Sequence, residues 1–130
     1  MFDLTMFILV IILTILVVVM IILYFFPIVN ICGNSMYPTY KDGEKILSTR
    51  LFFPDNLKVG DVVIFIPPSK THDEVQFVIK RVQHINDNGK FFLVGDNLDG
   101  SYDSRDYGYV DESHLISKAI KSRPKRWKEW

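Results

Sequence analysis

The segment GNSMYPT, from Gly33 to Thr39, places a serine between a glycine and a proline shortly after a long apolar run. Glycine and proline are typical of turns, so one interpretation is a turn through which the chain leaves a membrane helix. The other interpretation is that Ser35 is a catalytic nucleophile held at a membrane surface, which would need a basic group beside it. The segment alone leaves both interpretations open.

Lys80 also has unusual surroundings, because it lies within the apolar strand pattern EVQFVIKRVQHI. Side chains alternate between the two faces of a strand, so Val78, Lys80 and Val82 share one face. The opposite face is also largely apolar, with Phe77, Ile79 and Arg81. Burial in such surroundings disfavours an ammonium group and lowers its pKa. The alternative is a lysine whose side chain reaches solvent from a strand edge.

Glycine and acidic residues are dense in GDNLDGSYDSRDYGYV, from Gly95 to Val110, which is typical of a structured loop. Asp103 and Arg105 lie two positions apart, a spacing that allows a charge-assisted pair. The segment lacks the acidic series and terminal glutamate of an EF-hand, so we expect no calcium site. We expect no other metal and no cofactor, because the three histidines are too scattered for a ligand set: His72, His84 and His114.

An apolar segment precedes all of these residues and predicts a membrane anchor. The stretch from Phe7 to Phe26 is 20 residues long, has no charged residue and is interrupted only by Thr14 and Tyr24. A helix of this length spans about 30 Å, the thickness of a bilayer core. A cleaved signal peptide is the alternative, but its apolar region is usually shorter and ends in small residues, whereas this one ends in YFFPIVN. We expect a retained anchor in contact with the lipid bilayer.

The formal net charge is zero, yet the last ten residues, KSRPKRWKEW, hold five Lys or Arg against one Glu. A short basic stretch with tryptophan suits lipid headgroups, and a solvated tail is the alternative. The chain lacks the dense basic surface of a nucleic-acid binder, so we expect no nucleic-acid partner. The single Cys32 excludes an internal disulfide, and we expect it to be a small buried apolar residue.

Short strands separated by turn residues follow the anchor. The segments DGEKILS, VVIFIPP, EVQFVIKRVQHI and FFLVGDN read as strands, and helix signals are nearly absent. We therefore expect a mainly β fold, a compact and largely antiparallel β domain tethered by one N-terminal transmembrane helix. The expected boundaries are a tail at 1–6, the anchor at 7–26, a β-rich catalytic domain at 27–120 and a basic, Trp-containing tail at 121–130.

The order of these segments resembles that of bacterial type I signal peptidases, membrane-bound serine proteases that remove signal peptides from exported proteins. The resemblance rests on four motifs behind the apolar segment, SMYPT at 35–39, GDVVIF at 60–65, KRV at 80–82 and GDNLDGSYDSRDYG at 95–108. A Ser-Met pair with a downstream lysine also occurs in self-cleaving repressors. The last motif is the form that the peptidases carry and the repressors lack.

The resemblance implies a role for each matching residue. It implies that Ser35 is the nucleophile and, through its backbone N–H, the oxyanion donor, and that Lys80 is the general base. Ser101 would orient the lysine, and Asp103 and Arg105 would form a supporting ion pair. The other implied supporting residues are Asp96, Gly33 and Met36.

The sequence departs from the family pattern at two places. Gly33 stands where some members carry a hydroxyl that adds a second oxyanion donor. Gly95 follows Lys80 by only fifteen residues, so the insertion that most members carry there is nearly absent. The resemblance also implies that the catalytic domain lies on the outer face of the cytoplasmic membrane, although Lys41 and Lys45 slightly favour the opposite orientation.

The implied function is cleavage after small residues at the end of the signal peptide of an exported preprotein. The small size also suits a peptidase dedicated to one surface or pilus protein. A non-catalytic assembly factor on the same fold is the remaining alternative, and an intact Ser35 and Lys80 argue against it.

Overall fold

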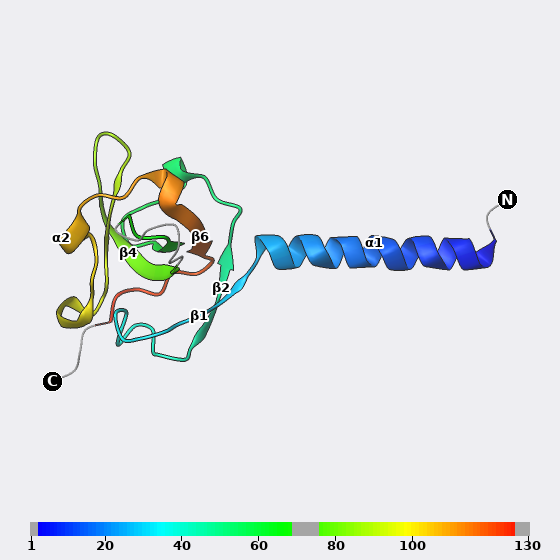
Figure 1. Ribbon diagram of the computed structural model, residues 1–130, viewed down its shortest axis with the longest axis horizontal. Helices are drawn as coiled ribbons and strands as arrows, with labels where there is room; N and C mark the ends of the chain where they lie inside the picture. The colour runs from blue at the N-terminus through cyan, green and yellow to red at the C-terminus, as the bar shows by residue number, and fades with distance from the viewer. Residues whose placement is uncertain (1–2, 69–75, 127–130) are drawn as a thin grey trace.

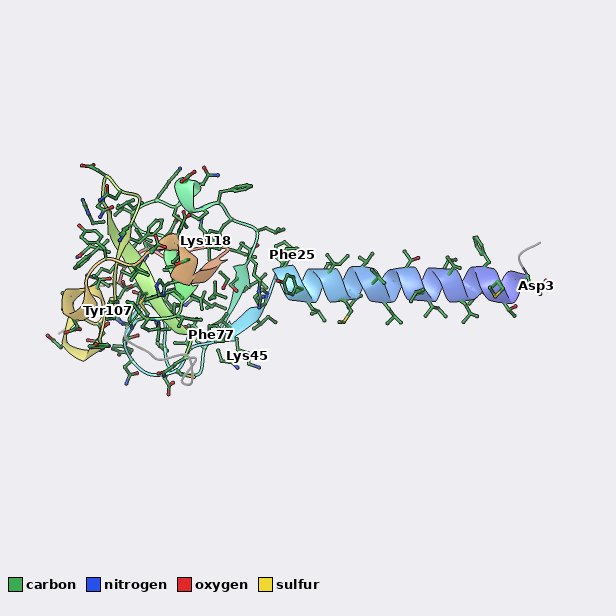
Figure 2. All side chains as sticks on the ribbon, turned by 45° about the horizontal axis from the view of Figure 1, so that its top comes forward. Asp3, Phe25, Lys45, Phe77, Tyr107 and Lys118 are labelled. Carbon is green, nitrogen blue, oxygen red and sulfur yellow. The ribbon has the colours of Figure 1, made fainter. Side chains whose placement is uncertain are left out.

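The computed structural model describes residues 3–68 and 76–126. Its first element, α1 (Leu4–Phe25), extends away from a small globular domain (Figure 1). None of its side chains is buried, and Figure 2 shows them projecting outwards along the helix. Within the described ranges, α1 is the one helix long and apolar enough to cross a membrane, by its length and composition. Such a surface is stable in lipid, where a helix satisfies its own backbone groups.

The observed bounds of α1 differ slightly from the expected anchor at 7–26. The helix begins at Leu4, because the three residues before Phe7 carry no charge and continue the same pattern. It ends at Phe25, since Phe26 precedes Pro27 and adopts a non-helical conformation with φ −126°. A residue before proline is sterically disfavoured in the helical region.

Six strands form the globular domain in a single antiparallel sheet of order β1-β2-β6-β3-β4-β5. The expected mainly β domain, tethered by one helix, is confirmed. The strands are β1 (Ile28–Asn30), β2 (Lys45–Thr49), β3 (Val62–Phe65), β4 (Val78–Ile85), β5 (Phe91–Val94) and β6 (Leu115–Ala119). The strand expected from EVQFVIKRVQHI begins at Val78, and its first two residues lie outside the described residues.

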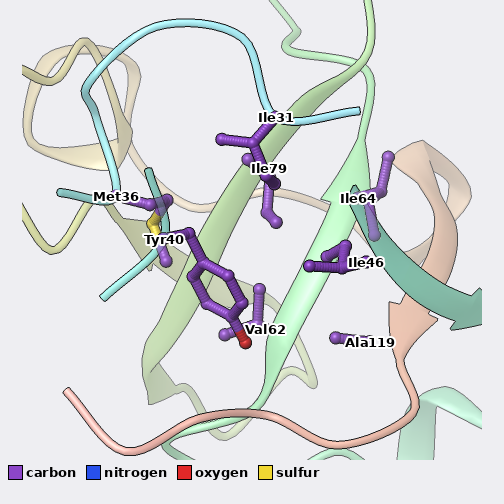
Figure 3. Packing of buried hydrophobic residues seen from close by; sticks show 8 residues of the cluster. All are labelled: Ile31, Met36, Tyr40, Ile46, Val62, Ile64, Ile79 and Ala119. Atoms are coloured by element: carbon purple, nitrogen blue, oxygen red, sulfur yellow. The ribbon is translucent and has the colours of Figure 1, made fainter. Parts of the chain in front are cut away.

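The central strand β3 is buried along its whole length, and its side chains alternate between two apolar clusters. Val62 and Ile64 belong to the cluster drawn in Figure 3, which also contains Met36 and Tyr40 from the loop after β1. Val63 and Phe65 belong to the second cluster, with residues of β4 and β5 such as Val82 and Leu93. The loop that carries Ser35 is therefore tied to the core.

Short helical turns connect the strands, contrary to the near absence of helix signals in the sequence. The clearest is α2 (Ser104–Tyr107), whose N-cap is Asp103. The Asp103 and Asp106 side chains form a reciprocal capping box, which satisfies backbone N–H groups at the start of a helix. The remaining turns are the 3₁₀ helices η1 (Pro54–Asn56), η2 (Leu98–Gly100) and η3 (Glu112–His114).

The end of α1 is bonded to the sheet. The backbone N–H of Arg50 donates to the carbonyl of Phe25, at 2.8 Å, and the N–H and hydroxyl of Ser48 both donate to the carbonyl of Pro27. The guanidinium of Arg50 also lies over the ring of Tyr24, 4.6 Å from its centroid. The helix and the sheet therefore meet through a short, hydrogen-bonded junction.

Residues 122–126 are hydrogen-bonded to the domain at several points, although Arg123, Pro124 and Arg126 are exposed to solvent. The N–H of Arg123 donates to the Tyr40 hydroxyl at 3.0 Å, and the N–H of Arg126 donates to the Thr39 hydroxyl at 3.0 Å. The Arg123 guanidinium pairs with Glu44 and stacks on the Tyr40 ring. The two tryptophans expected at a membrane surface, Trp127 and Trp130, lie outside the described residues.

Candidate active site

Ser35 lies on the loop between β1 and β2, which is closed by backbone hydrogen bonds. The N–H of Ile31 donates to the carbonyl of Glu44, and the N–H of Gly43 donates to the carbonyl of Ile31, both at 2.7 Å. Gly33 has φ +83°, a conformation that glycine adopts readily, and its N–H donates to Asp42 Oδ1 at 2.8 Å. These bonds define the turn in which Ser35 sits half-buried.

Met36 and Tyr40 anchor the same loop to the core. Met36 is 0% exposed and Tyr40 is 1% exposed, and both pack on the core cluster of Figure 3. The side chains on either side of Ser35 therefore point in different directions, with Met36 inside the core and Asn34 exposed. Met36 acts in this geometry as an apolar anchor for the residue before it.

Lys80 lies on β4, opposite Val63 of the central strand. It is 4% exposed, so the alternative of a lysine that reaches solvent from a strand edge is wrong. Burial lowers the pKa of Lys80 from 10.5 to about 8. The negative charge of Asp103 opposes this shift, and the positive charge of Arg105 adds to it. A lysine with this pKa supplies a neutral amine near neutral pH far more often than a lysine in water.

Ser35 and Lys80 line the same cavity, which has a volume of about 460 Å³. Its other walls are largely apolar and come from β1, the start of β4 and β6, with Ile28, Val29, Phe77, Val78, Ile79 and Ile116. Within residues 3–68 and 76–126, neither the Ser35 hydroxyl nor the Lys80 amine forms a hydrogen bond or ion pair. The structure thus brings the two groups to one cavity without bonding them, a common geometry for catalytic pairs without substrate.

Asp103 is the centre of the polar network beside the cavity and is 0% exposed. Arg105 Nε donates to Asp103 Oδ1 at 2.9 Å, which gives the ion pair expected from the spacing. Asp103 Oδ2 accepts from the Ser101 hydroxyl at 2.7 Å and from the Gly95 N–H at 3.0 Å. Burial alone would raise the pKa of Asp103, but these donors outweigh it and lower the pKa to about 2.

Ser101 was expected to orient Lys80. In the structure its hydroxyl proton goes to Asp103, and no hydrogen bond joins it to Lys80 among the described residues. Gly95 lies tightly between Ser101 and the loop that carries Ser35. A Cβ at Gly95 would lie 2.2 Å from Ser101 Oγ and 2.6 Å from the Ser35 carbonyl oxygen, so only glycine fits.

Asp96 belongs to a second network, which the sequence did not indicate. Two guanidinium nitrogens of Arg81, Nε and Nη2, each donate to one carboxylate oxygen of Asp96 at 2.8 Å. Asp96 Oδ2 also accepts from the Thr39 hydroxyl at 2.6 Å, and Arg81 Nη1 donates to the Gly60 carbonyl at 2.7 Å. Asp96 thus joins the strand of Lys80 to the loop of Ser35.

Asn97 is a further residue that sequence reasoning missed. Its backbone N–H donates to the carbonyl of Ser35 at 2.9 Å, and its side-chain Nδ2 donates to the carbonyl of Asn34 at 3.0 Å. The only signal in the sequence was its place in the GDN motif, which says nothing about a partner 63 residues away.

Cys32 is exposed, so the expectation of a buried apolar cysteine is wrong. The reason is its position in the loop, because its neighbour Ile31 fills the core and turns Cys32 outwards to the rim of the cavity. In the described part of the chain, no group of three or more His, Cys, Asp or Glu side chains is arranged to hold a metal ion.

Comparison with known proteins gives a family match over most of the chain. The model of the family "Signal peptidase, peptidase S26" matches residues 4–85 and 83–122. The chain is 36% identical over 80 residues to Signal peptidase I of Buchnera aphidicola subsp. Schizaphis graminum (strain Sg), which covers 58% of this chain and 26% of the relative. It is 49% identical over 45 residues to Signal peptidase I of Buchnera aphidicola subsp. Acyrthosiphon pisum (strain APS), covering 32% of this chain and 14% of the relative.

A third relative is the Mitochondrial inner membrane protease subunit 1 of Schizosaccharomyces pombe (strain 972 / ATCC 24843), 34% identical over 117 residues. That alignment covers 75% of this chain and 73% of the relative. The chain spans about a quarter or less of the two bacterial relatives and nearly three quarters of the mitochondrial one. The family model covers both the Ser35 loop and the segment that begins at Gly95. The chain therefore belongs to the signal peptidase family, peptidase S26.

Proposed function

We propose that the protein is a membrane-bound serine endopeptidase that removes N-terminal signal peptides from exported preproteins, cutting after small residues. Ser35 is the nucleophile and Lys80 the general base of this reaction. The observation that carries the proposal is that both side chains line one cavity and that Lys80 is buried with a pKa of about 8. The family membership supports the substrate class, since relatives are named Signal peptidase I.

The proposed reaction begins with attack of Ser35 Oγ on the scissile carbonyl carbon, while the neutral amine of Lys80 takes the hydroxyl proton. The backbone N–H of Ser35 stabilises the oxyanion of the tetrahedral intermediate. Collapse of this intermediate breaks the peptide bond, and the Lys80 ammonium gives its proton to the leaving amine. Lys80 then takes a proton from a water molecule that attacks the acyl carbon, and it returns this proton to Ser35 Oγ as the ester bond breaks, which restores the free serine and the neutral amine.

The apolar cavity suits a substrate in extended conformation. Its walls include residues of the strand β1 and of the start of β4. A peptide laid between them would place alternate side chains against the apolar walls. The charge of Asp103, which is held by Ser101 and Arg105, partly offsets the lowering of the Lys80 pKa by burial.

The protein associates with a membrane through α1. We propose further that α1 spans the bilayer once and that the sheet lies on the extracytoplasmic side, where signal peptides leave the membrane. Cys32 offers a test, because it is the one cysteine in the chain and is exposed. A membrane-impermeant maleimide should label it in intact cells, and Cys32→Ser should abolish the label. Labelling that requires lysis of the inner membrane would contradict this orientation.

The proposed activity is tested by co-expressing the protein with secreted precursors and following their size. Ser35→Ala and Lys80→Ala should each abolish processing. Ser113→Ala and Lys90→Ala are matched controls, because both residues are exposed and neither lines the cavity. Processing that survives Ser35→Ala or Lys80→Ala would contradict the mechanism.

A panel of precursors separates general from dedicated processing. Efficient cleavage of many precursors supports a general signal peptidase, whereas cleavage of one surface or pilus protein alone supports a dedicated enzyme. The short connection between β4 and β5, closed by the Asn86–Lys90 turn, is the feature that favours the narrower range. A folded preparation that does not react at Ser35 with a serine-directed acylating reagent would instead support a non-catalytic factor.

A further inference from the structure

Asn97 makes contacts on both sides of the candidate nucleophile. It donates its side-chain Nδ2 to the carbonyl of Asn34, which precedes Ser35, and its backbone N–H to the carbonyl of Ser35 itself. These carbonyls belong to the two peptide units that flank the Ser35 Cα. Since fixing both units fixes the backbone of Ser35, Asn97 acts as a clamp on this residue.

The direction of the Asn34 carbonyl determines the direction of the Ser35 N–H. The two groups belong to one planar peptide unit, and this unit is trans, since the Tyr37–Pro38 bond is the one cis bond among the described residues. In a trans unit the C=O and N–H point in opposite directions. The Asn34 carbonyl points towards Asn97, so the Ser35 N–H points away from the segment that contains Asn97.

The Ser35 N–H is also left without an acceptor among the described residues. Across the described ranges it donates no hydrogen bond, although the half-buried loop around it is extensively bonded. The Asn34 carbonyl accepts a second hydrogen bond, from the Tyr37 N–H at 3.1 Å. Hydrogen bonds accepted by a carbonyl polarise the peptide unit and make its own N–H a stronger donor.

Asn97 is itself held in one orientation. It is buried, at 9% exposed, and a Cβ at Gly100 would lie 2.8 Å from its Nδ2. Rotating the amide by half a turn would place Oδ1 against the Asn34 carbonyl, where two oxygens repel. In the observed orientation, Oδ1 is buried without a partner among the described residues. A buried unpaired oxygen is costly, which is the expected trade-off where a side chain serves function rather than stability.

We propose that Asn97 is a positioning residue, which orients the Ser35 N–H as oxyanion donor by holding the Asn34–Ser35 peptide unit. This inference rests on the proposed peptidase function. Removing the Nδ2 donor leaves the backbone bond from residue 97 to Ser35 in place, so the loop loses one of its two restraints. Oxyanion alignment matters only as charge develops on the substrate oxygen, so the rate of the chemical step should suffer more than substrate binding.

The test compares Asn97→Ala and Asn97→Asp in the full-length protein in detergent, with Asn86→Ala as the matched control. Asn86 uses its side chain to accept hydrogen bonds in the β4–β5 turn, so its loss perturbs a turn away from the cavity. Both Asn97 variants should lower kcat on a precursor by roughly 10- to 100-fold with little change in KM, below the loss of about 10²- to 10³-fold for deleting an oxyanion donor. The control should keep the wild-type kcat.

The pH dependence of kcat in the two variants provides a second readout, which would not change if Asn97 were merely structural. A carboxyl in place of the amide donates a hydrogen bond only when it is protonated. The ratio of the kcat of Asn97→Asp to that of Asn97→Ala should therefore rise as the pH falls below about 5. A ratio independent of pH, or a loss confined to KM, would overturn the positioning role.

A measurement without substrate separates failure of this inference from failure of the proposed function. In protein labelled with ¹⁵N-serine, the backbone signal of Ser35, assigned by its loss in Ser35→Ala, should shift in both Asn97 variants and stay in place in Asn86→Ala. An unchanged Ser35 signal would overturn the clamp even if cleavage is observed. A wild-type protein that cleaves no precursor, with a shifted signal in the variants, would overturn the peptidase while leaving the clamp.

Discussion

Lys80 derives its chemistry from a balance of opposing effects at a single residue. Burial between β3 and β5 penalises the ammonium form, and the nearby Asp103 carboxylate partly offsets this penalty. Asp103 itself stays ionised, because Arg105, Gly95 and Ser101 all donate to it. The outcome is an amine that is neither permanently charged, as on a protein surface, nor permanently neutral.

Under the proposed mechanism, the rate should rise with pH through an apparent pKa of about 8, because Lys80 must be neutral to accept the proton. The measurement is kcat/KM for precursor cleavage between pH 6 and 10. Asp103→Asn should move the midpoint lower, since the Asp103 charge raises the pKa of Lys80. A midpoint that stays near 10, or that moves upwards in Asp103→Asn, would contradict this assignment.

Lys80 should also cost stability at neutral pH. Its pKa of about 8 lies below the ordinary 10.5, so between these values the unfolded chain holds a proton that the folded protein has released. Stability therefore rises with pH across this window, and below pH 8 the full penalty is on the order of 3 kcal/mol. Lys80→Met should raise the free energy of unfolding at pH 7 and lose this advantage above pH 10.5.

Chemical denaturation of the two proteins at pH 7 and pH 10.5 measures the effect. Lys90→Met is the control, because Lys90 is exposed and its substitution should leave the difference between the two pH values unchanged. Equal differences between wild type and Lys80→Met at both pH values would show that burial of the ammonium is not the cause.

At the scale of elements, the site is assembled from three separate segments, which side-chain hydrogen bonds join. Arg81 belongs to β4, Asp96 to the segment after β5 and Thr39 to the loop that carries Ser35, and their side chains are hydrogen-bonded through Asp96. Thr39 also accepts from the N–H of Arg126, so the C-terminal segment adds a fourth connection. Ser35 and Lys80 keep their separation because these segments are joined.

Removing the Asp96 carboxylate from this network should lower the free energy of unfolding more than removing the Thr39 hydroxyl. Asp96→Asn should lower the free energy of unfolding by about 3 kcal/mol, because it leaves the mostly buried Arg81 without its carboxylate. Thr39→Val should cost about 1 to 2 kcal/mol through two lost hydrogen bonds. Denaturant titration checks the order, and a larger loss in Thr39→Val than in Asp96→Asn would contradict it.

The sequence predicted the parts of the site whose signals are local. The Ser35 turn, the apolar strand around Lys80 and the spacing of Asp103 and Arg105 can be read from neighbouring residues, and the Asp103–Arg105 ion pair is present in the structure. The roles of Ser35 and Lys80 in catalysis stay predictions.

The missed features depend on contacts between distant segments. Thr39 meets Asp96 across 57 residues and Asn97 meets Asn34 across 63, and no local pattern fixes such pairings. The short helix α2 could have been predicted, since Asp103 and Asp106 are spaced as a capping box. Cys32 was misjudged because composition says how often cysteine is buried, while the turn of the loop decides which way this one faces.

At the scale of the whole molecule, an apolar helix suited to lipid is joined to a β-sheet domain suited to water. α1 presents apolar side chains on all sides (Figure 2), whereas the sheet encloses its apolar residues in two clusters. The junction at Phe25, Pro27 and Arg50 is bonded on the sheet side. The position of the cavity relative to the membrane is therefore set by where α1 ends.

A charge at the middle of α1 should disturb this arrangement without touching the sheet. Leu13→Arg places a cation near the centre of the helix, at a cost of about 2.5 to 3.5 kcal/mol for insertion. We expect a smaller membrane-bound fraction in cell fractionation, with Leu13→Ile as the control. Unchanged membrane association in Leu13→Arg would argue that α1 is not the segment that enters the bilayer.

The junction between α1 and β1 limits how the protein can meet a substrate. Only Phe26 and Pro27 separate the helix from β1, and two residues span at most about 7 Å. The cavity is thus held close to the point where α1 ends. Under the proposed function, with the substrate held in the same bilayer, encounters become a search in two dimensions, governed by how many substrate molecules share a given area of lipid. Added lipid would slow such an enzyme by thinning its substrate across a larger surface, even when every concentration in the tube stays the same.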